Sequence, residues 1–361
     1  MLRDRTRMRT YDVVIVGAGP AGAFFARELA LNKPEIKIAL INGQKMENAK
    51  PCGGLLSPDA QKLLAKFNLT LPNSVLADPQ IFAVETIDLG TGCVRYYQRH
   101  YLNMDRYKLD MYLLSLVPSS VDIIADRCLS IERENEIYKL RLKNGEVCGL
   151  SIVGADGASS IVARSLFNKK TYKYTSIQGI YKCENPHLPH YSCIFDRKTS
   201  DSCSWTIRKN DYFIFGGAFK TASCREAYEK QKERLEEFIG YNLGKPLKIE
   251  ACMLTSPRKF SDFFIGDKGA YLIGEAGGFI SASSFEGISS AILSGKLLAD
   301  AYINGKNHKE ILKLYKKKTR KLRLKLFLKI QKRRILCSPF LRFLIMKSGI
   351  KSVEKYEIYS S

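Results

Sequence analysis

The sequence predicts a mixed α/β protein: a Rossmann-like nucleotide-binding domain interleaved with an antiparallel-sheet domain and followed by a helical C-terminal tail. Three observations support this fold class. Residues 11–31 read as a strand, a glycine turn and a helix; residues 170–220 are rich in Tyr, Phe, Ile and Thr with hairpin-like breaks; and the chain is strongly basic after residue 308. With 361 residues, 45% of them hydrophobic and 26% charged, the chain is long enough for two domains.

The N-terminal segment has the pattern of a dinucleotide-binding βαβ unit. The run "VVIV" at 13–16 is expected of a strand covered on both faces, and a second strand, "IKIALIN", follows the helix. Gly17, Gly19 and Gly22 complete the motif G-x-G-x-x-G between strand and helix. Such glycines permit a tight turn, close approach of the backbone to a pyrophosphate, and close packing of helix on strand. We therefore predict a phosphate site at these glycines and Ala21, with a glycine turn of some other α/β protein as the alternative.

Asn42 ends the second strand, where a dinucleotide site usually has Asp or Glu for the ribose hydroxyls. An amide still accepts a hydroxyl hydrogen bond, although more weakly than a carboxylate. Asn42 is therefore the predicted contact at the ribose end.

Further elements follow along the chain. We expect a helix from the Asn103–Asp105 region, strands joined by a turn at Asn144-Gly145, and an amphipathic helix in "CREAYEKQKERLEEFIGYNLG". The last helix before the tail is expected to open at Ser283-Ser284 and to end at Asn304-Gly305.

Two later segments again place a strand before a turn of small residues: "GADGASSIVAR" and "YLIGEAGGFISASSFEGISSAILSG". In this order, the three segments resemble the FAD-binding framework of the para-hydroxybenzoate hydroxylase-like flavoproteins over nearly the whole chain. The resemblance implies FAD as the cofactor. It gives Asp156 the place of the Asp-Gly turn in the middle motif, and Glu275 the place of the acid on the ribityl chain, where Asp is usual.

The same resemblance implies two more cofactor contacts, and a helix N-terminus adds a third region. Arg106 matches an arginine near the flavin and pyrophosphate, and Cys128 matches a position that contacts adenine through its backbone. Gly287 and Ile288 begin a helix whose N–H groups can stabilise negative charge on the pyrimidine ring of a reduced flavin.

A narrower resemblance, to the geranylgeranyl reductase family, rests on "KPCGGLL", "CSWTIRKNDYFIFGG" and "SFEGISSAILSG". It implies that Cys52, Gly53 and Gly54 lie near the isoalloxazine ring. The family's motif aromatic-x-Trp-x-Phe-Pro-Lys, followed by a glycine, is matched at Trp205, Lys209 and Gly216. Its other positions depart: Cys203, Ile207 and Arg208 replace the first aromatic, Phe and Pro, and Phe285 replaces a glycine in the third segment.

We accordingly expect an FAD-dependent oxidoreductase that reduces carbon–carbon double bonds of a prenyl (geranylgeranyl-type) or other hydrophobic substrate, with NAD(P)H or reduced ferredoxin as electron donor. Cys52 is the candidate proton donor, or a small residue that allows close flavin approach; Trp205 is a substrate wall, or core packing. A monooxygenase of the same fold and a non-catalytic flavin redox module are the alternatives. Halogenation is disfavoured, because the Trp-x-Trp-x-Ile-Pro motif of flavin-dependent halogenases lacks its first Trp and its Pro here.

These expectations divide the chain into three parts. Residues 10–70, 100–165 and 255–305 are assigned to a discontinuous FAD-binding domain, 71–99 and 166–254 to a β-sheet substrate or catalytic domain, and 306–361 to a basic helical C-terminal region.

The ten cysteines form no CxxC pair and the four histidines no ligand cluster, so we expect reduced thiols and no metal site. No uncharged apolar run of about twenty residues and no secretory signal is present, which favours a cytoplasmic protein.

The C-terminal tail carries much of the charge. Residues 309–361 hold 17 Lys or Arg against 3 acidic residues, out of a net charge of +22 for the chain. Its apolar residues are spaced for one stripe of a cationic helix: Ile311, Tyr315, Leu322, Leu326, Ile330 and Cys337. Such a helix can lie peripherally on the anionic inner face of a membrane or attract an acidic ferredoxin. The alternative is a helix that covers the flavin domain; nucleic acid is disfavoured, because no binding motif accompanies the charge.

Overall fold

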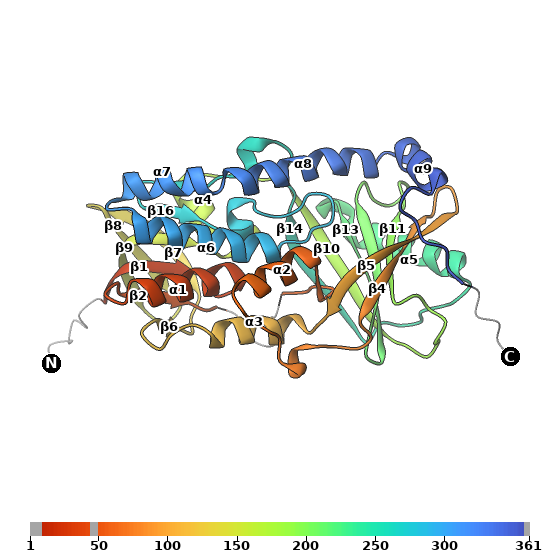
Figure 1. The fold of residues 1–361 in the computed structure, drawn as a ribbon, viewed down its shortest axis with the longest axis horizontal. Coiled ribbons are helices and arrows are strands. Elements are labelled where there is room, and N and C mark those ends of the chain that lie inside the picture. Colours follow the sequence, from red (N-terminus) through yellow and green to blue (C-terminus); the bar gives the residue numbers. More distant parts are fainter. Residues whose placement is uncertain (1–8, 44–49, 357–361) are drawn as a thin grey trace.

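The computed structural model describes residues 9–43 and 50–356. They form two eight-stranded sheets that lie next to each other along the long axis of the molecule, with helices packed against both (Figure 1). The predicted mixed α/β fold class is confirmed.

The first sheet is built around the N-terminal unit. β1 (Thr10–Val16), α1 (Pro20–Asn32) and β2 (Ile38–Ile41) form the predicted βαβ unit, and β1 lies between β2 and β9 (Glu146–Gly154), parallel to both. The path of the sheet is β15-β16-β9-β1-β2-β6, with the hairpin β7–β8 beside β9. The remaining strands are β6 (Asp122–Ile124), β7 (Cys128–Glu134), β8 (Ile137–Leu142), β15 (Gly266–Asp267) and β16 (Ala270–Leu272).

Alternate residues of β1 enter different cores. Val13 and Ile15 pack with α1 and with α6 (Ile288–Asn304), whereas Val14 and Val16 pack with the β7–β9 region and α4 (Ile161–Phe167). Burial on both faces explains why the strand reads as a continuous apolar run. It also leaves the carboxyl end of β1 as the position where a ligand can reach the sheet.

The second sheet has the order β14-β10-β13-β12-β11-β4-β5-β3 and is antiparallel except for the parallel pair β11–β4. α5 (Cys224–Ile239) covers one face through Tyr228 and Leu235. The strands are β3 (Leu55–Leu56), β4 (Ile81–Asp88), β5 (Cys93–Asn103), β10 (Lys173–Lys182), β11 (Tyr191–Phe195), β12 (Cys203–Lys209), β13 (Tyr212–Phe219) and β14 (Lys248–Thr255). β3 directly follows Gly54 and pairs with β5, so this part of the range 10–70 joins the second sheet.

Two helices lie near the junction of the sheets. α2 (Pro58–Lys66) follows β3, and α3 (Arg106–Ser115) starts at the predicted cap, where Asp105 accepts a 3.0 Å hydrogen bond from the Lys108 N–H.

α6 begins at Ile288 with Gly287 as N-cap, so the expectation that these two residues begin a helix is confirmed, whereas the expected opening at Ser283-Ser284 is wrong. Residues 281–286 instead close a turn, in which the Phe285 N–H donates to the Ser281 carbonyl and the Ser281 N–H donates to the Glu286 carbonyl. Phe285 has φ +53, outside the helical region, so the helix can start only after it.

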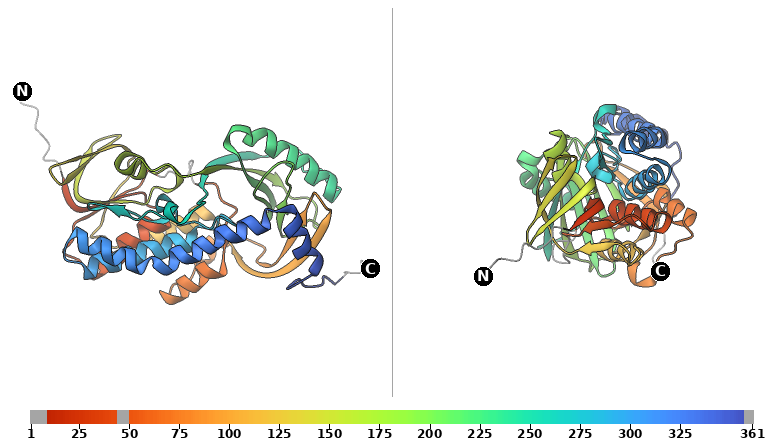
Figure 2. Two further views of the ribbon diagram at one scale, coloured as in Figure 1. Left: turned by 90° about the horizontal axis from the view of Figure 1, so that it is seen from above. Right: turned by 90° about the vertical axis from the view of Figure 1, so that its left-hand side faces the viewer.

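Up to residue 356, the part of the basic tail that the structure describes forms three helices, not one: α7 (His308–Lys318), α8 (Arg320–Leu336) and α9 (Pro339–Ser348). α7 lies over the first sheet, α8 runs from the first sheet to the second, and α9 packs at the far end (Figure 2). Five residues of the predicted apolar stripe are buried, and Cys337 is partly buried; the five are Ile311, Tyr315, Leu322, Leu326 and Ile330. The stripe therefore packs onto the protein itself. Among the described residues, no helix combines the length and hydropathy needed to cross a membrane.

Candidate active site

One cavity of about 810 Å³ extends from the carboxyl end of β1 to the second sheet. Its lining includes every predicted site residue except Gly22: Gly17, Gly19, Ala21, Asn42, Cys52, Gly53, Gly54, Arg106, Cys128, Asp156, Trp205, Glu275, Gly287 and Ile288. Gly22 instead lies against the turn, where an added Cβ would be 1.9 Å from the Gly17 carbonyl oxygen. Its absence of a side chain allows α1 to pack closely on β1.

The turn between β1 and α1 provides a site for an anion. Gly17 has φ +106, and a Cβ there would lie 2.6 Å from the Ala155 carbonyl oxygen, so only glycine suits the turn. Gly19 is the N-cap of α1, and among residues 9–43 and 50–356 no side-chain hydrogen bond caps this helix end. An added Cβ on Gly19 meets no atom within 4 Å. The positive end of the helix dipole and open space next to Gly19 suit a phosphate group.

Asp156 and Cys128 lie at the nucleotide end of the cavity. The Asp156 Oδ2 accepts a 2.6 Å hydrogen bond from the Ile161 N–H, while Oδ1 is buried without a hydrogen-bond partner among the described residues. Burial raises the pKa of Asp156. Burial, with Asp156 nearby, also raises the pKa of the Cys128 thiol to about 12, so Cys128 is a neutral part of the wall.

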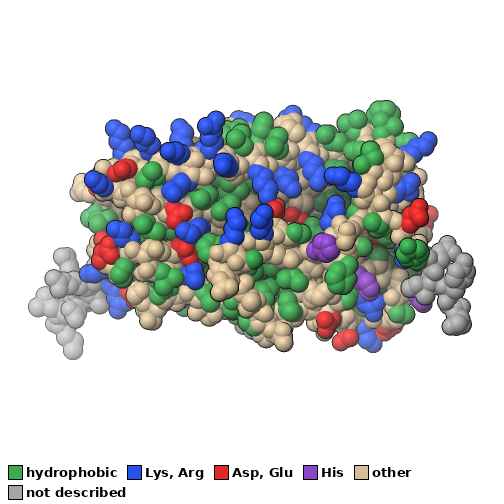
Figure 3. Space-filling model, viewed as in Figure 1, with side chains coloured by type: hydrophobic (Ala, Val, Ile, Leu, Met, Phe, Trp, Pro, Cys, Tyr) green, Lys and Arg blue, Asp and Glu red, His purple; other side chains and the backbone are tan. Residues whose placement is uncertain are grey.

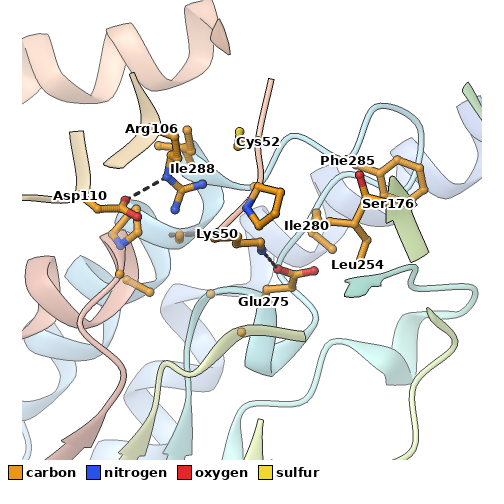
Figure 4. A pocket seen from close by; sticks show the side chains of 18 of the residues that line it. Lys50, Cys52, Arg106, Asp110, Ser176, Leu254, Glu275, Ile280, Phe285 and Ile288 are labelled. Atoms are coloured by element: carbon orange, nitrogen blue, oxygen red, sulfur yellow. Dashed lines mark hydrogen bonds and ion pairs between the residues drawn. The ribbon is translucent and has the colours of Figure 1, made fainter. Parts of the chain in front are cut away.

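Lys50 and Glu275 form an ion pair of 2.5 Å on the cavity wall (Figure 4). The other carboxylate oxygen of Glu275 accepts a 2.8 Å hydrogen bond from the Thr255 N–H, which fixes the side chain. Burial disfavours the ammonium form, but Glu275 outweighs this effect and the pKa of Lys50 is raised. The longer acid is thus held in place by a cation that motif reasoning did not include.

Arg106 is held by Asp110, with 2.9 Å between Nε and Oδ1, and both side chains are largely buried (Figure 4). Burial opposes the guanidinium charge, but Asp110 and the nearby Cys52 thiol raise the pKa of Arg106 overall. Arg106 therefore stays charged next to Cys52, and its charge is paired with that of Asp110.

The Cys52–Gly54 segment is held by Lys209 on β12. The Lys209 ammonium donates to the carbonyl oxygens of Gly53 at 2.9 Å and Met104 at 2.6 Å. Gly54 has φ +70, and a Cβ there would lie 2.2 Å from the Met104 oxygen. The Cys52 sulfur accepts a 3.4 Å hydrogen bond from the Gly54 N–H. Gly54 is therefore required by the close approach of Lys209 and Met104, whereas a Cβ on Gly53 would lie 2.4 Å from the Ile207 Cδ1. The Cys52 thiol supports the turn.

Trp205 and Gly216 are direct cross-strand neighbours on β12 and β13. An added Cβ on Gly216 would lie 2.9 Å from the Trp205 Nε1, so the indole lies over a strand position without a side chain. This explains physically the spacing of tryptophan and glycine in the sequence. Trp205 thereby forms part of the cavity wall.

Tyr101 and Glu286 form a polar pair at the end of the cavity near the second sheet. The Tyr101 hydroxyl donates a 2.6 Å hydrogen bond to Glu286 Oε1, and its ring contacts Tyr191 edge to face at 5.6 Å between centroids. Burial, together with Glu286, raises the pKa of Tyr101, so the phenol keeps its proton. A protonated phenol on a carboxylate can orient or protonate a substrate group.

Sequence reasoning missed Lys50, Tyr101 and Glu286 as site residues, and it placed Lys209 only within a motif. Glu286 precedes Gly287 in the quoted "FEGI" segment, so its position next to a predicted contact was a usable signal. Lys50 begins the quoted "KPCGGLL" segment, so its position next to predicted contacts was also a usable signal. Tyr101 lacks such a signal, because it reaches the cavity only through the tertiary fold.

Solved structures with a similar fold include a protein complexed with FAD. A geranylgeranyl bacteriochlorophyll reductase-like protein from Thermoplasma acidophilum aligns with a TM-score of 0.76 at 18% identity, over 94% of this chain and 91% of that one. PqsL from P. aeruginosa, in complex with 2-aminobenzoylacetate, aligns with a TM-score of 0.71 at 16% identity, over 94% and 100%. HpxO from Klebsiella pneumoniae, complexed with FAD and uric acid, aligns with a TM-score of 0.68 at 15% identity, over 96% and 93%. The fold is therefore that of the Rossmann-like FAD-binding flavoproteins.

No family model matches the sequence. Protein CbrA of Escherichia coli O6:H1 is 41% identical over 359 residues, which cover 98% of this chain and 97% of CbrA. Protein CbrA of Shigella sonnei is 42% identical over 353 residues, with 96% and 99% covered. On this similarity over nearly the full length of both proteins, the chain belongs to the CbrA family.

Proposed function

We propose that this protein is an FAD-dependent oxidoreductase that reduces carbon–carbon double bonds of a prenyl (geranylgeranyl-type) or other hydrophobic substrate. The observation that carries the proposal is one continuous cavity that joins the anion site at Gly19 to the wall at Trp205. A cofactor at one end and a substrate at the other would therefore meet next to Cys52–Gly54.

The residues at the nucleotide end fit FAD. The uncapped N-terminus of α1 at Gly19 suits a pyrophosphate, and the unpartnered Asp156 Oδ1 is an acceptor suited to a ligand hydroxyl. Asn42 and Cys128 line the same end, and the Lys50–Glu275 pair lies on the wall between this end and the second sheet. When bound, FAD supplies the two-electron redox chemistry.

The other half of the cavity suits an apolar substrate. Its wall is mostly hydrophobic and comes from β12, β14 and the loop before α6: Trp205, Ile207, Leu254, Ile280 and Phe285. Such a wall excludes water from the site of reduction and binds a hydrocarbon chain through buried area.

Two groups of the chain can supply the proton that alkene reduction requires. Cys52 Sγ lies next to Arg106, and the Tyr101 hydroxyl is hydrogen-bonded to Glu286. We propose Cys52 as the proton donor and the Tyr101–Glu286 pair as the anchor of a polar group on the substrate. The electron donor in this proposal is NAD(P)H or a reduced ferredoxin.

The experiment is turnover of prenyl lipids by the FAD-loaded protein, with and without oxygen, with NADPH and reduced ferredoxin compared. The proposal expects anaerobic product with one added pair of hydrogens per reduced bond. Product carrying oxygen from labelled dioxygen would identify a monooxygenase instead. FAD binding without turnover by either donor would identify a redox module. As a structural check, Tyr101→Phe should raise KM more than it lowers kcat, because it removes an anchor and not the proton donor.

A further inference from the structure

α9 buries a charged side chain and exposes apolar ones, the opposite of what a surface helix usually does. It buries Arg342 and Met346, which are 3% and 2% exposed, and directs four large apolar side chains outward. These are Phe340, Leu341, Leu344 and Ile345, with exposed fractions of 68%, 40%, 46% and 39%. A surface helix of a soluble protein normally turns its apolar stripe to the core.

Contacts inside the protein fix this orientation. Arg342 Nε lies 2.8 Å from Asp88 Oδ2 in an ion pair whose side chains are 4% and 1% exposed. The Arg342 guanidinium also lies over the Phe195 ring at 4.8 Å and donates to the Leu336 carbonyl oxygen. Rotating α9 to hide its apolar residues would expel this buried charge from its partners, which is costly.

The outer face of α8 continues the apolar surface. Leu324, Leu328 and Ile335 are 45%, 66% and 43% exposed, and positions 324, 328 and 335 fall on one side of a helix. The inner side of the same helix is the buried stripe of Leu322, Leu326 and Ile330. α8 is therefore apolar on two sides, and only one of them is covered by the protein.

Basic side chains flank this apolar surface. Figure 3 shows Lys and Arg along α7 and α8 and an apolar group over α9. Here the α8–α9 face means the seven exposed apolar residues with their basic neighbours Lys321, Lys332, Arg334 and Lys347. Exposed apolar residues surrounded by cations match a bilayer surface with anionic headgroups. A second copy of the chain is a poor occupant, because each copy carries +22 and would bring the same basic face against itself.

We propose that the α8–α9 face docks the protein peripherally on an anionic membrane surface, as at the inner face of a cell membrane. The apolar residues Phe340, Leu341, Leu344 and Ile345 insert at the headgroup level, and the lysines and arginines contact anionic lipid. This face is distinct from the buried stripe that the tail sequence suggested, and its docking does not depend on the redox activity.

Vesicle flotation of the full chain, loaded with FAD, tests the proposal. Phosphatidylcholine vesicles with phosphatidylglycerol should carry the protein, vesicles of phosphatidylcholine alone should carry much less, and salt should weaken the binding. The variant Phe340→Glu/Leu344→Glu should bind at least about tenfold more weakly. Leu31→Glu/Leu247→Glu is the matched control, because it changes two residues that are 55% and 63% exposed elsewhere and adds the same charge.

Retained binding by the control and lost binding by the α9 variant would support the proposal. Equal binding by both variants, or equal flotation with neutral and anionic vesicles, would overturn it. Sedimentation without lipid tests whether a second copy of the chain occupies the face instead. If the wild type is a dimer and the α9 variant is a monomer, the face serves self-association and the proposal is overturned.

Discussion

The Lys209 ammonium lies 2.9 Å from the Gly53 carbonyl oxygen and thereby ties a strand of the second sheet to the Cys-Gly-Gly segment. A cation on β12 thus fixes the backbone that lies between the nucleotide end of the cavity and its apolar wall. Cys52, the reactive candidate, is positioned by this contact through its own chain neighbour.

The lowered pKa of Lys209 predicts that the stability of the protein depends on pH. Burial lowers the pKa of Lys209 to about 8, while Cys52 and Asp105 partly oppose the shift. In the unfolded chain the pKa is near 10.5, so between these values the unfolded state binds more protons and the free energy of unfolding rises with pH. Compared with Lys209→Met, the wild type should gain up to about 1.4 kcal/mol per pH unit over that window. Denaturant unfolding at several pH values measures the difference; a constant difference from pH 8 to 10.5 would refute the depressed pKa.

Cys52→Ser separates chemistry from packing. The serine hydroxyl can still accept the hydrogen bond from the Gly54 N–H, so FAD affinity should stay within about twofold. A hydroxyl is a much weaker acid than a thiol, so kcat should fall about 100-fold if Cys52 donates the proton. Single-turnover kinetics on the proposed alkene substrate measure this loss. Full activity of the variant would leave Cys52 with the turn as its only role.

The backbone conformation of Phe285 predicts that a glycine variant is more stable than an alanine variant. Its φ of +53 lies in the left-handed region, which residues other than glycine rarely adopt. Phe285→Gly and Phe285→Ala both lose the ring contact with Tyr174, but only glycine relieves the backbone strain. The glycine variant should therefore be more stable than the alanine variant by about 1 kcal/mol. Thermal unfolding of the pair decides this, and an alanine variant of equal or higher stability would argue against the strained turn.

The Asp88–Arg342 pair should stabilise the second sheet and α9 strongly. Asp88→Asn leaves the buried Arg342 charge without its partner and should lower the free energy of unfolding by about 3–5 kcal/mol. Asp59→Asn is the control, since Asp59 and Lys325 form a 2.7 Å pair with side chains that are 49% and 54% exposed. The control should cost no more than about 1 kcal/mol. Equal losses in denaturant unfolding would contradict the account of α9.

Local patterns were sufficient to predict the β1–α1–β2 unit and the helix that starts at Arg106. Their signals lie within one segment: a glycine spacing for the turn and an Asp105 cap for the helix. The start predicted for α6 at Ser283-Ser284 was wrong because these serines lie in a turn closed by Ser281 and Glu286. Residue preferences do not reveal this backbone pattern.

Contacts between distant segments could not be predicted in this way. Lys50 and Glu275 are 225 positions apart and meet only when the two sheets are assembled. The tail shows the same limit, because α8 has apolar residues on both sides and spacing alone does not say which side the protein covers. Packing of Leu322, Leu326 and Ile330 into the core leaves the face with Leu324 and Leu328 outside.

The central claim is that the cavity binds FAD with its pyrophosphate at the turn before α1, and Gly19→Glu tests it most directly. A Cβ added at Gly19 meets no protein atom within 4 Å, and Gly19 lines the cavity, so a glutamate there should extend into the cavity with the fold retained. Its charge would repel a phosphate. Gly145→Glu is the control, because Gly145, in the turn between β8 and β9, is equally unobstructed. Titration of the apoprotein with FAD, followed by flavin fluorescence, should show one site in the wild type and the control and at least about 100-fold weaker binding in Gly19→Glu. A folded wild type that binds no FAD, or a Gly19→Glu variant that binds it equally well, would contradict the account.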